Sequence, residues 1–255
     1  MISLLTSSKT MDFNQPAPNF VSPTNLLFPE EAKTIQARLA CYSSDALAKL
    51  MNISSQLSTN VTGLYTEPSG KRKPAIYAYR GDVYRGFGAD SLDRGDMDWA
   101  NRHILIPSGL YGLVRPYDEI EQYRLEMKTK LELDKQKSLY GFWGDKLAKY
   151  VESMDDTVLV LASNEYAKAV VPKLSADIRV VEVHFKDRAK NGHIKTVPIY
   201  SKIMRGVMAR YIVKNRVNDT ASLRDFAEQG YVFDEAQSAD NKLVFYRDKP
   251  AVIAV

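Results

Sequence analysis

The hydrophobic residues of this chain of 255 residues are grouped in short runs, none of which approaches the ~18 residues that a membrane-spanning helix needs. Three of these runs have the length of a strand: "MISLL" at the start, "ILIPSG" from Ile104 and "DTVLVLAS" from Asp156. Continuous apolar runs of this length are typical of strands that are buried on both faces of a sheet. The runs alternate irregularly with helical patterns, and no clear linker divides the chain. We therefore predict an α+β (mixed α/β) fold, with one compact domain over residues 1–255 and a central sheet surrounded by helices.

The other elements follow from local signals. Four prolines between residues 13 and 29 predict an extended surface segment, because proline fixes φ and lacks a backbone donor. A proline followed by two acids starts a helix at Pro29. Further helices are expected within 134–154, over 164–171 and over 201–216, and two more over 43–65 with a break at 51–54. Further strands are expected over 177–187, 193–200, 230–234 and 242–248. Asn191-Gly192 predicts a turn between the strands 177–187 and 193–200.

Several classes of site lack their sequence signal. No glycine-rich phosphate loop has P-loop or Rossmann spacing. The three histidines are isolated, and Cys41 is the single cysteine, so neither a metal site, a cofactor nor a disulfide is predicted. The N-terminus does not have the pattern of a signal peptide, which makes a cytoplasmic protein without membrane contact the simplest expectation.

Positive charge is concentrated in one part of the chain. Residues 185–217 hold nine Lys or Arg and one acid, Asp187, for a local net charge of +8, whereas the whole chain carries +4. Such a concentration favours a polyanionic partner, although a solvated basic face without a partner fits the composition as well.

The predicted helix 201–216 carries part of this charge. Met204, Val207, Met208 and Tyr211 have the spacing of a buried stripe. The opposite side carries Lys202, Arg205 and Arg216 together with the small residues Gly206 and Ala209. We expect the small residues to let a bulky anion approach the helix backbone; an ordinary amphipathic helix with a hydrated basic face is the alternative.

The two helices expected over 43–65 have apolar spacing like that of a helix-hairpin-helix. In this motif, backbone N–H groups of a tight turn bind a DNA phosphate without reading the base sequence. The usual glycines are absent, but Asn tolerates positive φ and Ser54 or Ser55 can cap the second helix. A plain helical hairpin is the alternative. The turn would consist of Met51, Asn52, Ile53 and Ser54.

Several segments, taken together and in order, resemble the YaaA family of bacterial peroxide-stress proteins. They include "LLTSSKTMDF" near the N-terminus, "YRGDVYRG" from Tyr79, "SGLYGLVRPYDEIEQYRLEM" from Ser108, "LASNEYAKAV" from Leu161 and "RGVMARYIV" from Arg205. The resemblance implies a fold particular to that family, a positively charged cleft and a helix-hairpin-helix element. It also implies a DNA-binding protein active in oxidative stress, iron homeostasis and DNA repair.

The resemblance also implies a set of site residues. The cations expected in the DNA-binding cleft are Lys9, Arg80, Arg115, Arg124, Lys130, Lys186, Lys202, Arg205 and Arg210, and Lys128 adds one where the family commonly has glycine. The supporting acids are Asp118, Glu126 and Glu165, and Tyr111 and Tyr123 either pack beneath the cations or stack on a base. The family's hairpin glycine is Asn52 here.

Two functions are consistent with the sequence. The first is a monomeric, sequence-tolerant protein that binds duplex and branched DNA through phosphate contacts and protects against peroxide and iron-dependent DNA damage. The second is an enzyme acting on a nucleotide or nucleic acid through the cluster of Arg115, Asp118, Arg124 and Glu126, because converging acids favour tuned pKa values. Acids facing an enclosed pocket would favour the enzyme, and acids paired behind an open groove would favour DNA binding.

Overall fold

The computed structural model describes residues 1–188 and 193–248, in which a central sheet of eight strands organises the chain. The three apolar runs form adjacent strands of this sheet: β8 (Thr157–Val160), β1 (Ile2–Leu4) and β5 (Ile104–Ser108). All three pair in parallel, and almost all of their residues are buried. Burial on both faces is the reason why these strands read as continuous apolar runs.

The sheet is mixed, as expected. Its order is β11 (Val232–Phe233), β12 (Lys242–Arg247), β9 (Arg179–Arg188), β8, β1, β5 and β6 (Gly112–Val114), and β10 (Ile194–Lys195) pairs with the end of β9. The five strands from β12 to β5 run parallel, whereas β11, β6 and β10 are antiparallel to their neighbours. Two small sheets pair β2 (Thr10–Met11) with β4 (Tyr79–Arg80) and β3 (Arg72–Pro74) with β7 (Glu119–Glu121).

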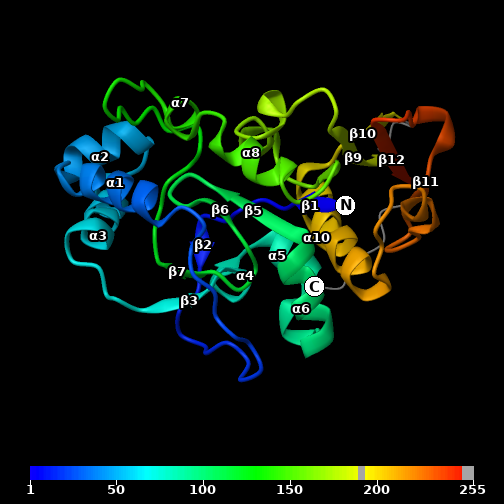
Figure 1. The fold of residues 1–255 in the computed structure, drawn as a ribbon, viewed down its shortest axis with the longest axis horizontal. Helices are drawn as coiled ribbons and strands as arrows, with labels where there is room; N and C mark the ends of the chain where they lie inside the picture. The colour runs from blue at the N-terminus through cyan, green and yellow to red at the C-terminus, as the bar shows by residue number, and fades with distance from the viewer. Residues whose placement is uncertain (189–192, 249–255) are drawn as a thin grey trace.

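Helices cover the sheet on both sides (Figure 1). In this view α7 (Leu139–Trp143) and α8 (Lys146–Glu152) lie above the central strands, and α5 (Asp82–Phe87) and α6 (Arg94–His103) lie below them. Three helices are grouped at the left: α1 (Pro29–Ala40), α2 (Ser44–Met51) and α3 (Ser55–Thr66). The remaining α-helices of the described residues are α4 (Ala75–Ala78), α9 (Asn164–Ala167) and α10 (Pro198–Asn215).

Three helical regions differ from their prediction, and the first of them, the helix expected over 164–171, is reduced to Asn164–Ala167. The helix α10 begins at Pro198, three residues earlier than expected, because proline suits the first helical turn, and the strand expected over 193–200 is reduced to β10. The helix expected within 134–154 is divided into α7 and α8 at Gly144, whose φ of +54° ends the first helix. The predicted Asn191-Gly192 turn and Lys190 lie outside the described residues.

The small residues of α10 receive another helix, which corrects the prediction that they admit an anion. A Cβ at Gly206 would lie 1.8 Å from the carbonyl oxygen of Val83 in α5. A Cβ at Gly86 in α5 would lie 2.1 Å from the carbonyl oxygen of Ile203 in α10. The two helices therefore touch backbone to backbone, and Gly206 and Ala209 are buried. In the expected buried stripe, Met204 and Met208 are fully buried, whereas Val207 and Tyr211 are partly buried.

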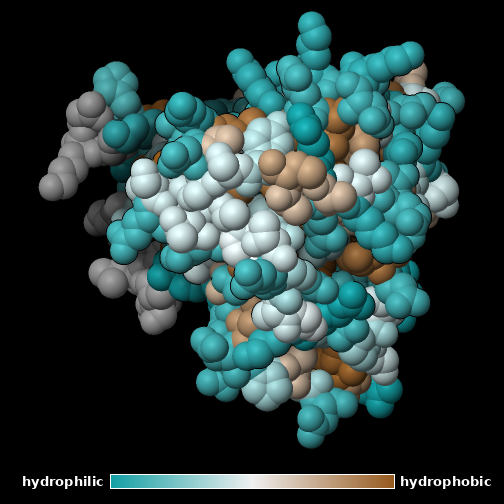
Figure 2. Space-filling model, turned by 90° about the vertical axis from the view of Figure 1, so that its left-hand side faces the viewer, coloured by the Kyte–Doolittle hydropathy of each residue, from teal (hydrophilic) through white to brown (hydrophobic). Residues whose placement is uncertain are grey.

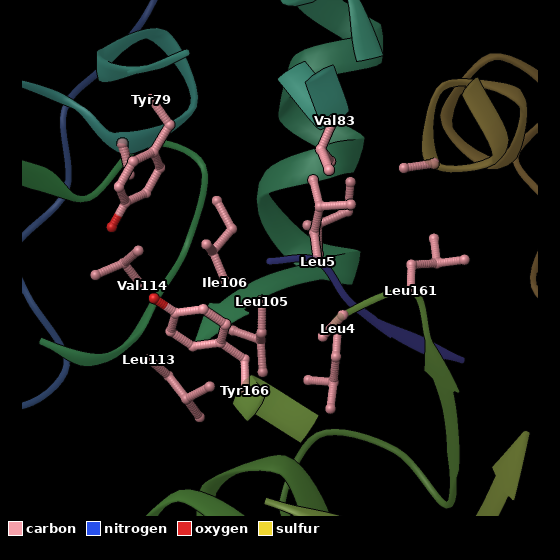
Figure 3. Packing of buried hydrophobic residues seen from close by; sticks show 14 of the residues in the cluster. Leu4, Leu5, Tyr79, Val83, Leu105, Ile106, Leu113, Val114, Leu161 and Tyr166 are labelled. Carbon is pink, nitrogen blue, oxygen red and sulfur yellow. The ribbon is translucent and has the colours of Figure 1, made fainter. Parts of the chain in front are cut away.

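The core around the sheet joins strands to these helices (Figure 3). Leu4 lies between Leu105 and Leu161, in agreement with the position of β1 between β5 and β8. The face over α1–α3 is mainly hydrophilic, with its hydrophobic residues in small separate patches (Figure 2). None of the described helices is long and apolar enough to cross a membrane.

Candidate functional site

A cavity of about 580 Å³ opens at the carboxyl ends of β1 and β8. The segment Thr6–Thr10, which follows β1, and Ser163, which follows β8, line it. The chain leaves β1 toward β5 on one side and leaves β8 toward β9 on the other side. In parallel sheets a ligand crevice forms where neighbouring strands diverge in this way. We call this the strand-end cavity.

Positively charged side chains from four parts of the chain face the strand-end cavity. Lys9 comes from the segment after β1, Arg80 from β4, and Lys202 and Arg205 from α10. The segment after Met127 adds Lys128. Three acids share the wall: Asp82, Glu126 and Glu165. The fold thus brings together seven of the residues that the sequence predicted for the site, from positions 9 to 205.

Two of the acids bind two of the lysines. Glu126 forms ion pairs with Lys9 and, over 3.4 Å, with Lys128. The Glu165 carboxylate lies 3.8 Å from the Lys128 ammonium and also accepts a hydrogen bond from the backbone N–H of Lys128. Burial and the charges of Lys128 and Arg124 lower the pKa of Lys9. The acids therefore hold cations together that would otherwise repel one another.

The two cations from α10 differ from these lysines. Lys202 and Arg205 have no carboxylate or hydrogen-bond partner among residues 1–188 and 193–248, and the Nε of Arg205 is shielded from solvent. Burial lowers the pKa of the Arg205 guanidinium, because removal of water disfavours its charged form. Within the described residues no carboxylate forms an ion pair with either side chain, although the charge of Glu182 raises the pKa of Arg205 in part.

A second cavity, of about 570 Å³, lies between the α2–α3 hairpin and residues 124–130. Lys49, Arg124 and Lys130 line it, and each lacks a carboxylate partner in the described part of the chain. Met51, Asn52 and Ile53 of the hairpin turn form one of its walls. We call this the hairpin cavity.

The hairpin itself has the predicted geometry. Asn52 ends α2 with φ 51° and ψ 58°, the left-handed conformation that asparagine tolerates. Ser54 caps α3, because its hydroxyl accepts a hydrogen bond from the backbone N–H of Leu57 at 3.3 Å. The structure thus contains a tight helical hairpin at the position where the sequence predicted one.

The two cavities adjoin, because Lys9, Glu126 and Lys128 stand in the walls of both. Together they form what we call the basic groove, which runs from the hairpin turn to the ends of β1 and β8. Eight lysine or arginine side chains and three carboxylates line it, so its net charge is +5. Positive potential gathered in a concave surface attracts anions more strongly than the same charge dispersed.

Arg115 and Asp118 do not line the basic groove. The buried Asp118 accepts hydrogen bonds from the Arg115 guanidinium at 2.9 Å and from the Thr24 hydroxyl at 2.6 Å. Arg115 also donates to the carbonyl of Asn25 at 2.8 Å. This pair fastens the proline-rich segment to the core, and it is separate from the cavities that hold Arg124 and Glu126. The four-residue cluster expected for an enzyme therefore does not exist as one site.

Most of the basic segment 185–217 also serves other contacts. Lys186 donates to Gln237 at 2.8 Å, and Arg210 donates to the carbonyls of Phe87 and Gly88 at the end of α5. Lys214 and Arg216 bind Asp96 of α6 at 2.9 and 3.0 Å. Arg210 faces a third cavity, of about 710 Å³, which adjoins the strand-end cavity at Arg80, Gly81 and Tyr84. Of the described cations in this segment, Lys202 and Arg205 line the basic groove.

The two tyrosines expected near the site are buried beneath it and do not offer a stacking surface. Tyr123 is 5% exposed, and its hydroxyl bonds to those of Tyr79 at 2.7 Å and Ser108 at 2.8 Å. Tyr111 is 3% exposed, and its hydroxyl oxygen accepts a hydrogen bond from the backbone N–H of Glu121 at 3.1 Å. Both rings therefore support the segment that carries Arg124 and Glu126.

Sequence reasoning missed several contributors to the groove, among them Asp82 at the start of α5. Lys49 is an isolated charge on α2, and only its position beside the hairpin turn could have indicated it. Ser7 directly follows the first strand, and residues after parallel strands commonly line ligand sites. No group of three or more His, Cys, Asp or Glu side chains placed to hold a metal occurs within 1–188 and 193–248.

Comparison with known proteins finds matches along almost the whole chain. The family model described as peroxide stress protein YaaA matches residues 1–237. A UPF0246 protein of Alteromonas mediterranea is 40% identical over 262 residues, covering 98% of this chain and 99% of its own length. A UPF0246 protein of Burkholderia vietnamiensis is 40% identical over 261 residues, covering 97% and 98%.

Proposed function

We propose a DNA-binding function for this protein, which belongs to the peroxide stress protein YaaA family. The proposed ligand is duplex or branched DNA, bound through its phosphates in the basic groove with little dependence on base sequence. In this role the protein protects DNA during peroxide stress and against iron-dependent damage.

One observation carries the proposal: five cations along one groove have no carboxylate or hydrogen-bond partner for their side chains among the described residues. They are Lys49, Arg124 and Lys130 in the hairpin cavity and Lys202 and Arg205 in the strand-end cavity. A lysine or arginine that already binds a carboxylate gains little from a phosphate, whereas an unpaired one can neutralise it and release counterions. Contacts to phosphates position DNA without reading its sequence, which fits binding through these charges.

The helical hairpin fits the same ligand. Its turn stands at the end of the groove, and Asn52 supplies the left-handed conformation that a helix-hairpin-helix turn takes from glycine. The helix α3 has 12 residues, and its N-terminus adds a partial positive charge beside the turn. We assign the hairpin a secondary role, because its neutral N–H groups displace few counterions.

A matched pair of double variants tests the proposal. Lys49→Gln with Lys130→Gln removes two charges from the groove. Lys168→Gln with Lys173→Gln removes two charges from exposed lysines outside it, so both variants have the same net charge. Binding is measured by fluorescence anisotropy with three duplexes of unrelated sequence and one four-way junction. We expect the first variant to bind all four at least about tenfold more weakly, and the second to bind within about twofold of the parent.

Equal losses in the two variants would show that net charge and not the groove determines binding. Absence of binding by the parent at low salt would remove the proposed function altogether. A strong preference for one duplex would contradict the dominance of phosphate contacts.

One specific observation supports the second candidate, an enzyme that acts on a nucleotide or nucleic acid. Lys9 lies in the strand-end cavity with a lowered pKa and contacts Glu126. A lysine of this kind can serve as a base or nucleophile. Turnover of DNA or nucleotides that is abolished by Lys9→Met, with binding retained, would favour this candidate.

A further inference from the structure

The strand-end cavity has a charge surplus of a definite size. Five lysine or arginine side chains and three carboxylates line it, which leaves +2. Lys9 and Lys128 bind Glu126 and Glu165, Arg80 binds Asp12 at 3.3 Å, and Asp82 binds Arg85 at 2.9 Å. The surplus is therefore located on Lys202 and Arg205, which lie three residues apart on α10.

Two buried polar atoms in the same cavity also lack partners. The Nε of Arg205 is shielded from solvent and donates no hydrogen bond to any described residue. The Ser7 side chain is 8% exposed, and its Oγ has no partner of hydrogen-bond geometry there, although the Tyr123 and Tyr166 hydroxyls lie close to it. A buried polar group without a partner costs about 1–3 kcal/mol. Two such groups beside an unpaired double charge indicate a ligand that supplies acceptor oxygens and two negative charges.

A phosphomonoester has this chemistry. It carries about −1.5 to −2 charges at pH 7 and three acceptor oxygens. An internal phosphodiester of DNA carries only one negative charge and would leave about half of the surplus. The volume of about 580 Å³ is that of a site for a small organic ligand, and Glu126 and Glu165 offer acceptors for hydroxyl or amino groups.

We propose that the strand-end cavity binds the terminal phosphate of a nucleotide, with Arg205, Lys202 and Ser7 around its oxygens. The shared chemistry is a nucleoside phosphomonoester. It has two sources: a free mononucleotide, or the 5′-phosphorylated end of a DNA strand that lies in the basic groove. The second source rests on the proposed DNA-binding function, whereas the first does not.

Calorimetric titration tests the free nucleotide. The probes are deoxyadenosine 5′-monophosphate and deoxyadenosine, titrated into the parent, Arg205→Gln, Lys202→Gln and the control Lys168→Gln, which alters an exposed lysine outside both cavities. We expect the monophosphate to bind at least about tenfold more tightly than the nucleoside, because charge-assisted hydrogen bonds to the phosphate are lost without it. Each cavity variant should weaken monophosphate binding roughly tenfold, and the control should lie within about twofold. Lys202 is exposed, so Lys202→Gln remains informative if Arg205→Gln fails to fold.

Anisotropy with a labelled duplex tests the DNA end. One form carries 5′-phosphates and the other 5′-hydroxyls. Tighter binding of the phosphorylated duplex that is lost in Lys202→Gln assigns the cavity to DNA ends, even if the free monophosphate does not bind. The proposal is overturned if neither probe gains affinity from its phosphate, or if the gain survives both cavity variants. In that case, salt-sensitive binding of the 5′-hydroxyl duplex would still leave the DNA-binding function intact.

Discussion

At the scale of single residues, two arginines whose guanidinium groups are wholly or partly shielded from solvent have opposite surroundings. Arg247 is 1% exposed and binds Asp187 at 2.7 Å, with the Tyr231 and Tyr200 rings 4.2 and 4.8 Å from its guanidinium carbon. Tyr231 completes this set by donating to Asp187 at 2.7 Å. Arg205 has no such partner among the described residues. A buried charge is tolerable when it is paired and costly when it is not.

Replacement of each arginine by methionine should therefore change stability in opposite directions. Arg205→Met removes an uncompensated charge while retaining much of the side-chain volume, and we expect the free energy of unfolding to rise by about 1–2 kcal/mol. Arg247→Met leaves Asp187 buried without its partner, and we expect a loss of about 3–5 kcal/mol. Urea denaturation of both variants measures the difference. A destabilised Arg205→Met would show that Arg205 contributes to the fold and not to a ligand site.

The sequence could identify the charged residues but not their partners. Helical spacing placed Lys202 and Arg205 on one side of a helix, and the structure brings both to the strand-end cavity. The concentration of charge over 185–217 grouped Arg210, Lys214 and Lys186 with them, although these three bind carbonyls, Asp96 and Gln237. Whether a cation is free depends on acids and carbonyls that are distant in the sequence, and periodicity contains no information about those.

At the scale of elements, the crossing of α5 and α10 determines where the groove's cations lie. Gly86 and Gly206 allow the two backbones to touch, and Lys202 and Arg205 flank this contact along α10. A wider separation of the helices would move both side chains relative to the end of β1. The glycine contact is thus a structural condition of the strand-end cavity.

Two glycine-to-alanine changes should have opposite effects. Gly206→Ala places a methyl group 1.8 Å from a backbone oxygen, and we expect a loss of at least about 3 kcal/mol together with weaker DNA binding. Gly63→Ala in α3 meets no atom within 4 Å and should stabilise by about 0.5–1 kcal/mol through helix propensity. Thermal unfolding of both variants provides the comparison. Equal stability of Gly206→Ala and the parent would contradict the backbone contact.

The elements that were predicted correctly have strong local signals. The buried strands β1, β5 and β8, the start of α1 and the break between α2 and α3 follow from apolar runs, a proline and turn residues. The short helix α5 could not be predicted in this way, since its six residues include two aromatic residues and a glycine. Its helical conformation depends on packing against α10, which begins at Pro198, 111 residues after α5 ends at Phe87.

At the scale of the whole molecule, positive charge is strongly uneven. The chain carries a net +4 and the groove residues +5, so the rest of the chain sums to −1. A polyanion is therefore attracted to one face, and the remainder of the surface offers it no net attraction. DNA binding should consequently report on a small, countable set of side chains.

The salt dependence of DNA binding measures that number. Each phosphate neutralised on duplex DNA contributes about 0.9 to the slope of log affinity against log salt. With five unpaired cations in the groove, we expect a slope of about −4.5 and no steeper, because Lys9, Lys128 and Arg80 are already compensated by carboxylates. The variant Lys49→Gln with Lys130→Gln should have a slope of about −2.7, whereas Lys168→Gln with Lys173→Gln should retain the parent's slope. Asn52→Gly should also retain it, since the hairpin turn contributes neutral N–H groups. Titrations at four salt concentrations measure these slopes. A slope far steeper than −4.5 would require cations outside the groove. DNA would then contact a larger surface than the groove that joins the hairpin turn to the ends of β1 and β8.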